Sequence, residues 1–264
     1  MSDTISSSQD AATPIVIVGH VDHGKSTLIG RLLHDTDNLQ DGKVAQIIES
    51  SKKRGLKIEW SFLLDSLQIE RDQGVTVDST RIPFRLDTRE YVIVDAPGHR
   101  QFLRNMITGA ADAEAAVLVV DAVEGAREQT RRHAMLLHLI GIRHVIVLLN
   151  KVDLLDFDQA KVEAVEVSVN ELLGKLGLEA AYFVPASARD GDNIASRSER
   201  SPRYSGPTLP AALARVPTPA SRSVLALRFP VPDVYRFGDH RYVACRFERV
   251  PLPVAPTVVL ILRA

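Results

Sequence analysis

The sequence predicts an α/β fold built on a mixed, mostly parallel sheet with helices on both faces. From Pro14 onward, short apolar runs rich in β-branched residues alternate with longer amphipathic stretches, the pattern of strand and helix in turn. The runs at 81–86 and 91–94 are separated only by a short polar segment, which predicts an antiparallel hairpin at one edge of the sheet. With 45% hydrophobic and 25% charged residues in 264, the composition suits a globular protein with a substantial core.

The individual elements follow from this alternation. The expected strands are residues 15–18, 81–86, 91–94, 116–120, 144–149 and 182–185. The expected helices are residues 25–34, 100–109, 128–139, 159–176 and 208–213. Between Thr36 and Asp78 the apolar periodicity is weak and charges are dense, which predicts a long insertion after the first helix. Loops of that length are usually functional.

Composition also divides the chain into segments. Residues 1–13 are polar and rich in Ser and Asp, and we expect them to form a disordered tail. Residues 14–214 hold the alternating pattern and form the expected main domain. Residues 215–221 are rich in Pro and Ser, which predicts a linker, and residues 222–264 contain short strand-like runs.

Charge and apolar content exclude several classes of protein. Lys plus Arg (32) nearly balances Asp plus Glu (33), so no overall basic field is available to bind DNA. The arginines within 196–203 are interpreted as a solvated loop. No apolar run reaches the length of a membrane span. Cys245 is the one cysteine, so an internal disulfide is impossible, and a cytoplasmic location is expected.

A phosphate-binding loop is the strongest motif in the chain. Residues 19–26 fit the pattern G-x-x-x-x-G-K-[ST], placed after a strand and before a helix, which predicts a P-loop NTPase. Its glycines let backbone N–H groups surround phosphates, Lys25 reaches the terminal phosphates, and the Ser26 hydroxyl can bind magnesium. The predicted phosphate-binding residues are Gly19, His20, Val21, Asp22, His23, Gly24, Lys25, Ser26 and Thr27.

A second motif, Asp95-Ala96-Pro97-Gly98-His99, follows the run at 91–94. Asp95 is expected at the carboxyl end of a strand, where ligands bind in sheets of this kind, and can hold magnesium through water. The Gly98 N–H can meet the terminal phosphate, and this contact is lost on hydrolysis. The loop is therefore expected to act as a switch.

The motif Asn150-Lys151-Val152-Asp153 directly follows the apolar run at 144–149 and predicts the base site. The Asp153 carboxylate can accept hydrogen bonds from N1–H and N2–H of guanine, whereas adenine offers no hydrogen at N1. Such a site discriminates because an unmatched buried polar group stays desolvated. Ser187-Ala188, after the last expected strand, can present a backbone N–H to guanine O6. GTP and GDP with Mg²⁺ are therefore the expected ligands.

These motifs, in this order over residues 14–213, resemble the translation-factor GTPases. That family includes elongation factors Tu and 1-alpha and the GTPase subunit of bacterial sulfate adenylyltransferase. The resemblance makes Thr76 the first-switch residue that binds magnesium and the γ-phosphate, and His99 the residue that orients the attacking water. It also implies that Val21 and Val75 screen His99, so that basal turnover is slow, and that Asp22 lies near a monovalent cation. The expected catalytic residues are His99, Thr76 and Lys25.

The branch of the family is indicated by shorter stretches. Three of them, at 30–36, 129–133 and 191–199, look like the sulfate adenylyltransferase GTPase subunit, which would couple GTP hydrolysis to sulfate activation by a separate small subunit. Against this, His20 and His23 give the phosphate loop an elongation-factor spelling, and Arg203 replaces the family's Trp. The sequence favours sulfate activation. The alternative is a translational GTPase whose partners are aminoacyl-tRNA and the ribosome.

The carboxyl-terminal segment resembles the start of the β-barrel that follows the GTPase domain in this family. From Arg222 only 43 residues remain, about half of what such a barrel is expected to need. We expect residues 222–264 to form an incomplete, truncated barrel with an exposed strand edge. A third hypothesis follows, in which the chain is a truncated nucleotide-binding module that does not hydrolyse GTP.

Overall fold

The computed structural model describes residues 12–39, 60, 81–95, 113–217, 233–237 and 240–244. By its internal contacts the chain divides into two compact units, Met1–Pro217 and Thr218–Ala264. None of the described helices has the length and apolar composition that a bilayer span requires. The first unit contains the described P-loop and base motif.

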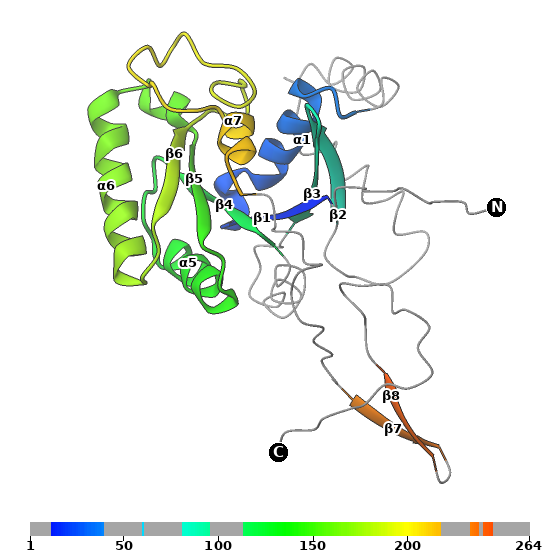
Figure 1. Cartoon of the computed structure of the whole chain (residues 1–264). Coiled ribbons are helices and arrows are strands. Elements are labelled where there is room, and N and C mark those ends of the chain that lie inside the picture. Colours follow the sequence, from blue (N-terminus) through cyan, green and yellow to red (C-terminus); the bar gives the residue numbers. More distant parts are fainter. Residues whose placement is uncertain are drawn as a thin grey trace, which may run out of the picture. The chain divides into compact units, whose positions relative to one another are not determined.

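The first unit is built on a six-stranded sheet in the order β2-β3-β1-β4-β5-β6 (Figure 1). The strands are β1 (Thr13–Gly19), β2 (Arg81–Leu86), β3 (Arg89–Asp95), β4 (Ala115–Asp121), β5 (His144–Asn150) and β6 (Ala180–Pro185). All neighbouring pairs are parallel except β2 and β3, which form the predicted antiparallel edge hairpin. The predicted mixed, mostly parallel sheet is confirmed.

Four α-helices of the described chain cover this sheet. They are α1 (Lys25–Asp35), α5 (Glu128–Ile140), α6 (Gln159–Lys175) and α7 (Leu209–Ala214). Each of them matches a predicted range to within two residues at either end. Two short 3-10 turns, η1 (Val21–His23) and η3 (Val152–Leu155), follow β1 and β5. The helix predicted at 100–109 lies outside the described residues.

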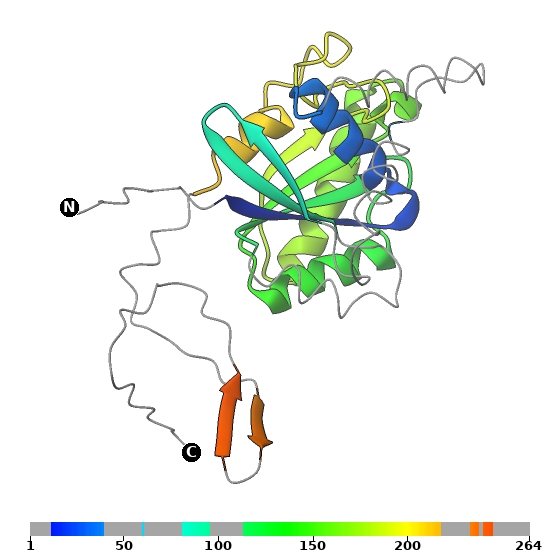
Figure 2. The same cartoon turned by 90° about the vertical axis from the view of Figure 1, so that its right-hand side faces the viewer.

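Alternation within the strands produces two apolar cores, one on each face of the sheet. Ile15 and Ile17 of β1 pack with α1 and α7, while Val16 and Val18 of the same strand pack with α5 and α6. Figure 2 shows the two pairs of helices on opposite sides of the sheet. Because both faces are covered, the central strands are apolar at almost every position, as parallel strands generally are. All seven residues of β4 are buried.

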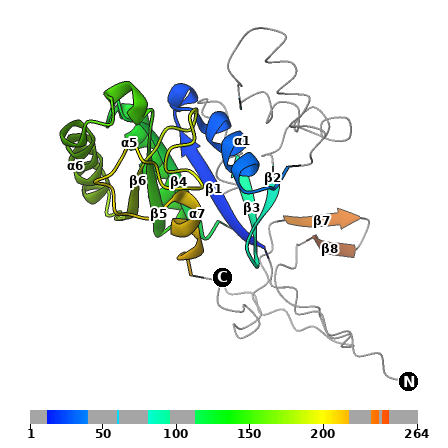
Figure 3. The ribbon, with the colours of Figure 1, turned by 90° about the horizontal axis from the view of Figure 1, so that it is seen from above.

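The chain after β6 is long and irregular, and it returns to α1. In Figure 3 the yellow segment between β6 and α7 spans from the start of α6 toward α1. Two arginine contacts match this path. Arg31 of α1 donates to the Arg189 carbonyl at 3.3 Å, and the Arg200 guanidinium lies 4.2 Å from the centre of the Phe157 ring.

The boundaries of the predicted segments are only partly described. β1 begins at Thr13, inside the range predicted as a tail, because Thr13 is buried and opposite Tyr91 in the ladder. Residues 1–11 lie outside the described residues. In the second unit, β7 (Asp233–Phe237) and β8 (His240–Ala244) form an antiparallel ribbon. The incomplete barrel over 222–264 therefore stays a prediction.

Candidate nucleotide-binding site

The motif residues meet at the carboxyl-terminal ends of the parallel strands. The phosphate loop begins at the last residue of β1, Asp121 ends β4, the base motif begins at the last residue of β5, and Ser187 follows β6. These four strands are parallel, so their carboxyl ends share an edge, which is where ligands bind in open α/β sheets.

The glycines of the phosphate loop permit close backbone approach. A Cβ added to Gly19 would lie 2.5 Å from the Val119 carbonyl oxygen, and one added to Gly24 would lie 2.5 Å from Asn150 Nδ2. Gly24 also has the left-handed conformation, with φ of 85°, at the point where α1 begins. A side chain at either position would occupy space that the loop fold requires.

Lys25 is buried at the first residue of α1. Its ammonium donates to the carbonyl oxygens of Gly19 and His20 at 2.7 and 2.8 Å, so it lies within the curve of the loop. Ser26 and Thr27 follow in the first helical turn and are partly buried, whereas Val21 and Asp22 of η1 are exposed.

The His23 side chain lies beneath the loop. It is 1% exposed, and its Nδ1 lies 3.1 Å from the Val119 carbonyl oxygen, which can only accept, so Nδ1 donates. Nε2 lies 3.4 Å from Glu124 Oε2. The His23 side chain therefore anchors the loop to β4, and the predicted phosphate contact of residue 23 stays a prediction that concerns its backbone N–H.

Two further histidines lie close to this anchor. The His20 ring meets the His23 ring edge-on at 5.5 Å. His133 of α5 is buried, and its Nδ1 has no hydrogen-bond partner among the residues that the structure describes. Burial, and to a lesser extent the charges of Lys25, His23 and His20, lower the pKa of His133 to about 4.

Asn150 joins the phosphate loop to the loop after β6. Its Nδ2 donates to the His23 carbonyl at 2.8 Å, and its Oδ1 accepts from the Ala188 N–H at 2.9 Å. The side chain is buried, so both bonds are shielded from water. Asn150 therefore acts here as a brace between two loops.

Lys151 and Asp121 form an ion pair beside this brace, with 2.6 Å between Nζ and Oδ2. Burial acts to raise the pKa of Asp121, but hydrogen bonds from Lys151 and from the Val123 and Glu124 N–H groups hold it below its usual value. Asp121 was missed by sequence reasoning. Asp121 could have been identified from its position at the carboxyl end of an apolar strand, next to the strand that precedes Lys151.

The Asp153 carboxylate is buried and paired with Arg189. The distance from Arg189 Nη2 to Asp153 Oδ2 is 2.7 Å, and the side chains are 53% and 7% exposed. Sequence reasoning also did not identify Arg189 as a site residue, although it directly follows Ser187-Ala188.

The backbone N–H groups predicted to face guanine O6 already have partners. Ser187 N–H donates to the Asp192 carbonyl at 3.2 Å, and Ala188 N–H donates to Asn150. The contact with O6 stays a prediction, and it requires one of these bonds to be shared or exchanged when the base binds.

The structure does not describe the side chains of the remaining predicted site residues. Thr76, Gly98 and His99 lie outside the described residues, as does Val75, and of Asp95 only the backbone is described, at the end of β3 opposite Ile17. Of the three predicted magnesium ligands, Ser26 alone has a described side chain. Within the described ranges, no group of three or more His, Cys, Asp or Glu side chains could hold a metal ion.

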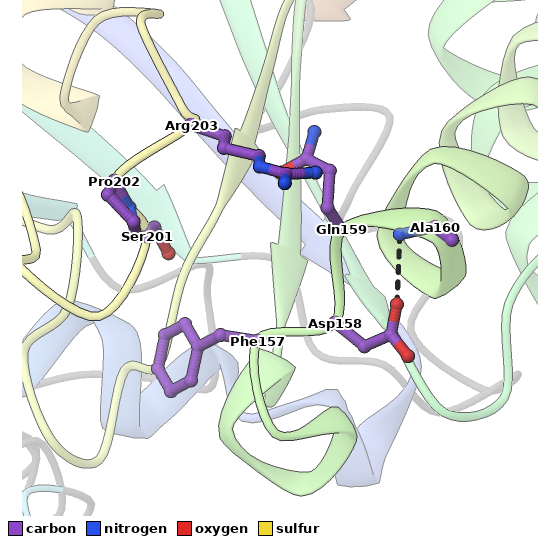
Figure 4. Close-up of a pocket in the computed structure, with 7 residues that line it drawn as sticks. All are labelled: Phe157, Asp158, Gln159, Ala160, Ser201, Pro202 and Arg203. Carbon is purple, nitrogen blue, oxygen red and sulfur yellow. Dashed lines mark hydrogen bonds between the residues drawn. The ribbon is translucent and has the colours of Figure 1, made fainter.

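A separate pocket of about 300 Å³ lies between the start of α6 and the loop after β6 (Figure 4). Asp158 caps α6 there by accepting from the Ala160 and Lys161 N–H groups. No predicted site residue lines it. Its lining residues are Phe157, Asp158, Gln159, Ala160, Ser201, Pro202 and Arg203.

Comparison with known proteins gives the same outline. A family model described as elongation factor Tu GTP binding domain matches residues 11–227. The elongation factors 1-alpha of Pyrococcus abyssi and Pyrococcus horikoshii are each 45% identical over 246 residues, which are 93% of this chain and 57% of theirs. The chain therefore spans little more than half the length of these relatives. They agree better with the elongation-factor alternative than with sulfate activation.

Solved structures agree on the fold. The GTPase-like domain of Saccharomyces cerevisiae Ski7 bound to GTP superimposes with a TM-score of 0.62 at 23% identity, over 76% of this chain and 48% of that one. Sup35 complexed with GDP gives 0.56 at 26% identity, over 86% and 50%.

Proposed function

The chain belongs to the family of elongation factor Tu GTP-binding domains, and from this premise we propose that it binds GTP and GDP and hydrolyses GTP as a translational GTPase of the elongation-factor type. The observation that carries the proposal is the Asn150 brace. It joins the loop proposed for the phosphates to the loop proposed for the base, at the edge of the sheet where such ligands bind.

In this proposal the phosphates lie against residues 19–27. The close approaches at Gly19 and Gly24 support a backbone cradle, because a β-carbon at either would intrude on it. Lys25 supplies positive charge from the start of α1, whose amino terminus adds its own partial charge. The hydroxyl and carboxylate oxygens of Ser26, Thr76 and Asp95 suit Mg²⁺. When bound, that ion supplies charge that neutralises the phosphate oxygens.

The base is assigned to Asp153, with Asn150 and Lys151 holding the surrounding loops. A buried carboxylate that accepts from N1–H and N2–H of guanine is left without those donors by adenine. The expected preference for guanine over adenine nucleotides is about 10⁴-fold or more. Calorimetric titration of the purified chain with GDP, GTP, ADP and ATP measures it, and equal affinities for the two purines would remove the proposal.

Hydrolysis is assigned to His99, which would orient the attacking water once a partner moves it inward. We expect slow basal turnover, measured as phosphate release, that falls further in His99→Ala while GDP affinity stays the same. A variant that hydrolyses GTP at the parental rate would refute this role. Measurable turnover by the parent chain would exclude the third hypothesis, a module that binds without hydrolysing.

The partner proposed for the translational function is aminoacyl-tRNA on the ribosome. It is supported by relatives named elongation factor 1-alpha. Because the chain spans 57% of those relatives, tRNA contact by this chain is tested directly by filter binding with GTP or GDP present. GTP-dependent retention supports it, and none with either nucleotide counts against it.

Sulfate activation is the second candidate. It is favoured by the stretches at 30–36, 129–133 and 191–199, and it requires a small adenylyltransferase subunit as partner. Co-purification with that subunit, and GTP-dependent adenylyl sulfate synthesis by the pair, would establish it. Failure of both would remove it without affecting the proposed GTP chemistry.

A further inference from the structure

Arg189 lies where the base is expected and uses the same carboxylate. Its Nη2 donates to Asp153 Oδ2 at 2.7 Å, a length typical of charge-assisted hydrogen bonds, and its Nε donates to Asp190 Oδ1 at 3.2 Å. Burial makes a partner for the Asp153 carboxylate necessary, because an ionised group removed from water without one is costly.

Arginine and guanine offer similar donors to a carboxylate. The N1–C2–N2 edge of guanine is a guanidine built into a ring, and it presents two parallel N–H groups. The arginine side chain presents N–H donors on a planar guanidinium that matches a carboxylate in the same way. Adenine has no such edge. Arg189 is thus a chemical analogue of the base edge that Asp153 is proposed to recognise.

The loop that bears Arg189 is fixed by contacts that do not involve the Arg189 guanidinium. The Arg189 backbone carbonyl accepts from Arg31 of α1, and Asn193 Nδ2 donates to the Pro185 carbonyl at 2.7 Å. Arg200 pairs with Asp190 and Asp192 at 3.1 and 3.2 Å. The Arg189 side chain, 53% exposed, can therefore leave Asp153 while the loop stays in place.

We propose that Arg189 is an internal competitor of guanine: its guanidinium pairs with the Asp153 carboxylate in the nucleotide-free protein and is displaced when the base binds. This inference rests on the proposed function. The ion pair stabilises the nucleotide-free protein and weakens guanine nucleotide binding, so Arg189 sets the affinity and the lifetime of the complex. Adenine nucleotides, which cannot replace the pair, are rejected at the same step.

The test is calorimetric titration of Arg189→Gln with GDP and GTP, compared with the parent chain. We expect about three- to tenfold tighter binding, the range for losing one charge-assisted pair that is partly exposed to water. The matched control is Arg203→Gln. Arg203 is exposed on the same loop and carries the same charge, and it belongs to none of the contacts named above that fix the loop. Loss of a positive charge alone weakens binding of a polyanion, so the control is expected to bind no more tightly than the parent.

A second measurement needs no nucleotide. Urea unfolding of the parent, Arg189→Gln, Asp153→Asn and the double variant forms a double-mutant cycle. We expect the two changes to be non-additive, because either one alone removes the pair. Additive effects would overturn the inference. Weaker or unchanged GDP binding by Arg189→Gln would also overturn it, because Arg189 would then remain in place or contact the bound nucleotide.

The two proposals fail in different ways. If parent and variant both bind guanine nucleotides with no gain in the variant, the competitor role alone is refuted. If neither binds them, the proposed function fails and the competitor role fails with it.

Discussion

Replacing Asn150 by Ala is expected to cost far more stability than the loss of one small side chain. The substitution removes the donor to the His23 carbonyl at 2.8 Å and the acceptor of the Ala188 N–H at 2.9 Å, and all of these groups are buried. Each buried backbone group left unpaired costs about 1–3 kcal/mol, so about 2–6 kcal/mol is expected in total. Against a typical free energy of unfolding of about 5–15 kcal/mol, this is a large fraction.

Urea unfolding followed by far-ultraviolet circular dichroism measures this loss. With a urea dependence of about 3 kcal/mol per molar, a loss of about 4 kcal/mol shifts the midpoint by more than about 1 M. The variant Asn150→Asp is the matched control for shape. It keeps an acceptor for Ala188 but places a carboxylate oxygen against the His23 carbonyl, so it is destabilised at neutral pH.

Protonation of the carboxylate introduced by Asn150→Asp supplies a donor again. The stability deficit of this variant relative to the parent should therefore shrink as the pH falls. A stability change below about 0.5 kcal/mol for Asn150→Ala, comparable to an ordinary surface substitution, would refute the brace.

Two further outcomes are expected. The pKa of His133 is about 4 in the folded protein and 6.5 in the unfolded chain, so the unfolded chain takes up the proton first as the pH falls. The contribution of His133 to stability is therefore fully present above about pH 6.5, and up to about 3 kcal/mol is lost as the pH falls to 4. Urea unfolding across that pH range should show this dependence. We expect His133→Gln to remove it and His138→Gln, a control at an exposed position, to retain it. An unchanged pH profile in His133→Gln would contradict the assignment to His133. Gly24→Ala places a Cβ 2.5 Å from Asn150 Nδ2 at a φ of 85°, so we expect about 1–3 kcal/mol of strain and at least about tenfold weaker GDP binding by calorimetry. Gly125→Ala is the control: its φ is 68°, and a Cβ there meets no atom of the described chain within 4 Å, so it should keep the parental affinity.

The fold was largely predictable because its elements are set by local patterns. Continuous apolar runs predicted the buried central strands, and the short polar segment at 87–89 predicted the edge hairpin. The strand ends were less predictable. β1 starts at Thr13 and β6 at Ala180, because pairing with neighbouring strands extends the ladder beyond the apolar run.

The site was predictable as a set of loops but not as a set of side-chain contacts. The motif places His23 in the phosphate loop, yet its ring turns down to Val119, 96 residues away in sequence. The same holds for Arg189, which belongs to none of the motifs and reaches Asp153 across the gap between two loops. Such contacts depend on which strands become neighbours, and no local pattern encodes that.

The motifs also did not identify the branch of the family to which the chain is most similar. Short stretches at 30–36, 129–133 and 191–199 favoured sulfate activation, whereas identity of 45% over 246 residues is found with elongation factors 1-alpha. Short stretches sample few positions, so agreement along most of the chain outweighs them.

The brace at Asn150 also constrains when the phosphate loop acquires its shape during synthesis. The loop is fixed to a side chain 127 residues further along the chain, which at about 5–20 residues per second leaves the ribosome roughly 6 to 25 seconds later. Until β4 has been made and has paired with β1, and β5 with β4, the nascent loop lacks the contacts at Val119 and Asn150. Nucleotide capture is thus postponed until most of the sheet exists, and a nascent chain stalled before that point would stay unliganded.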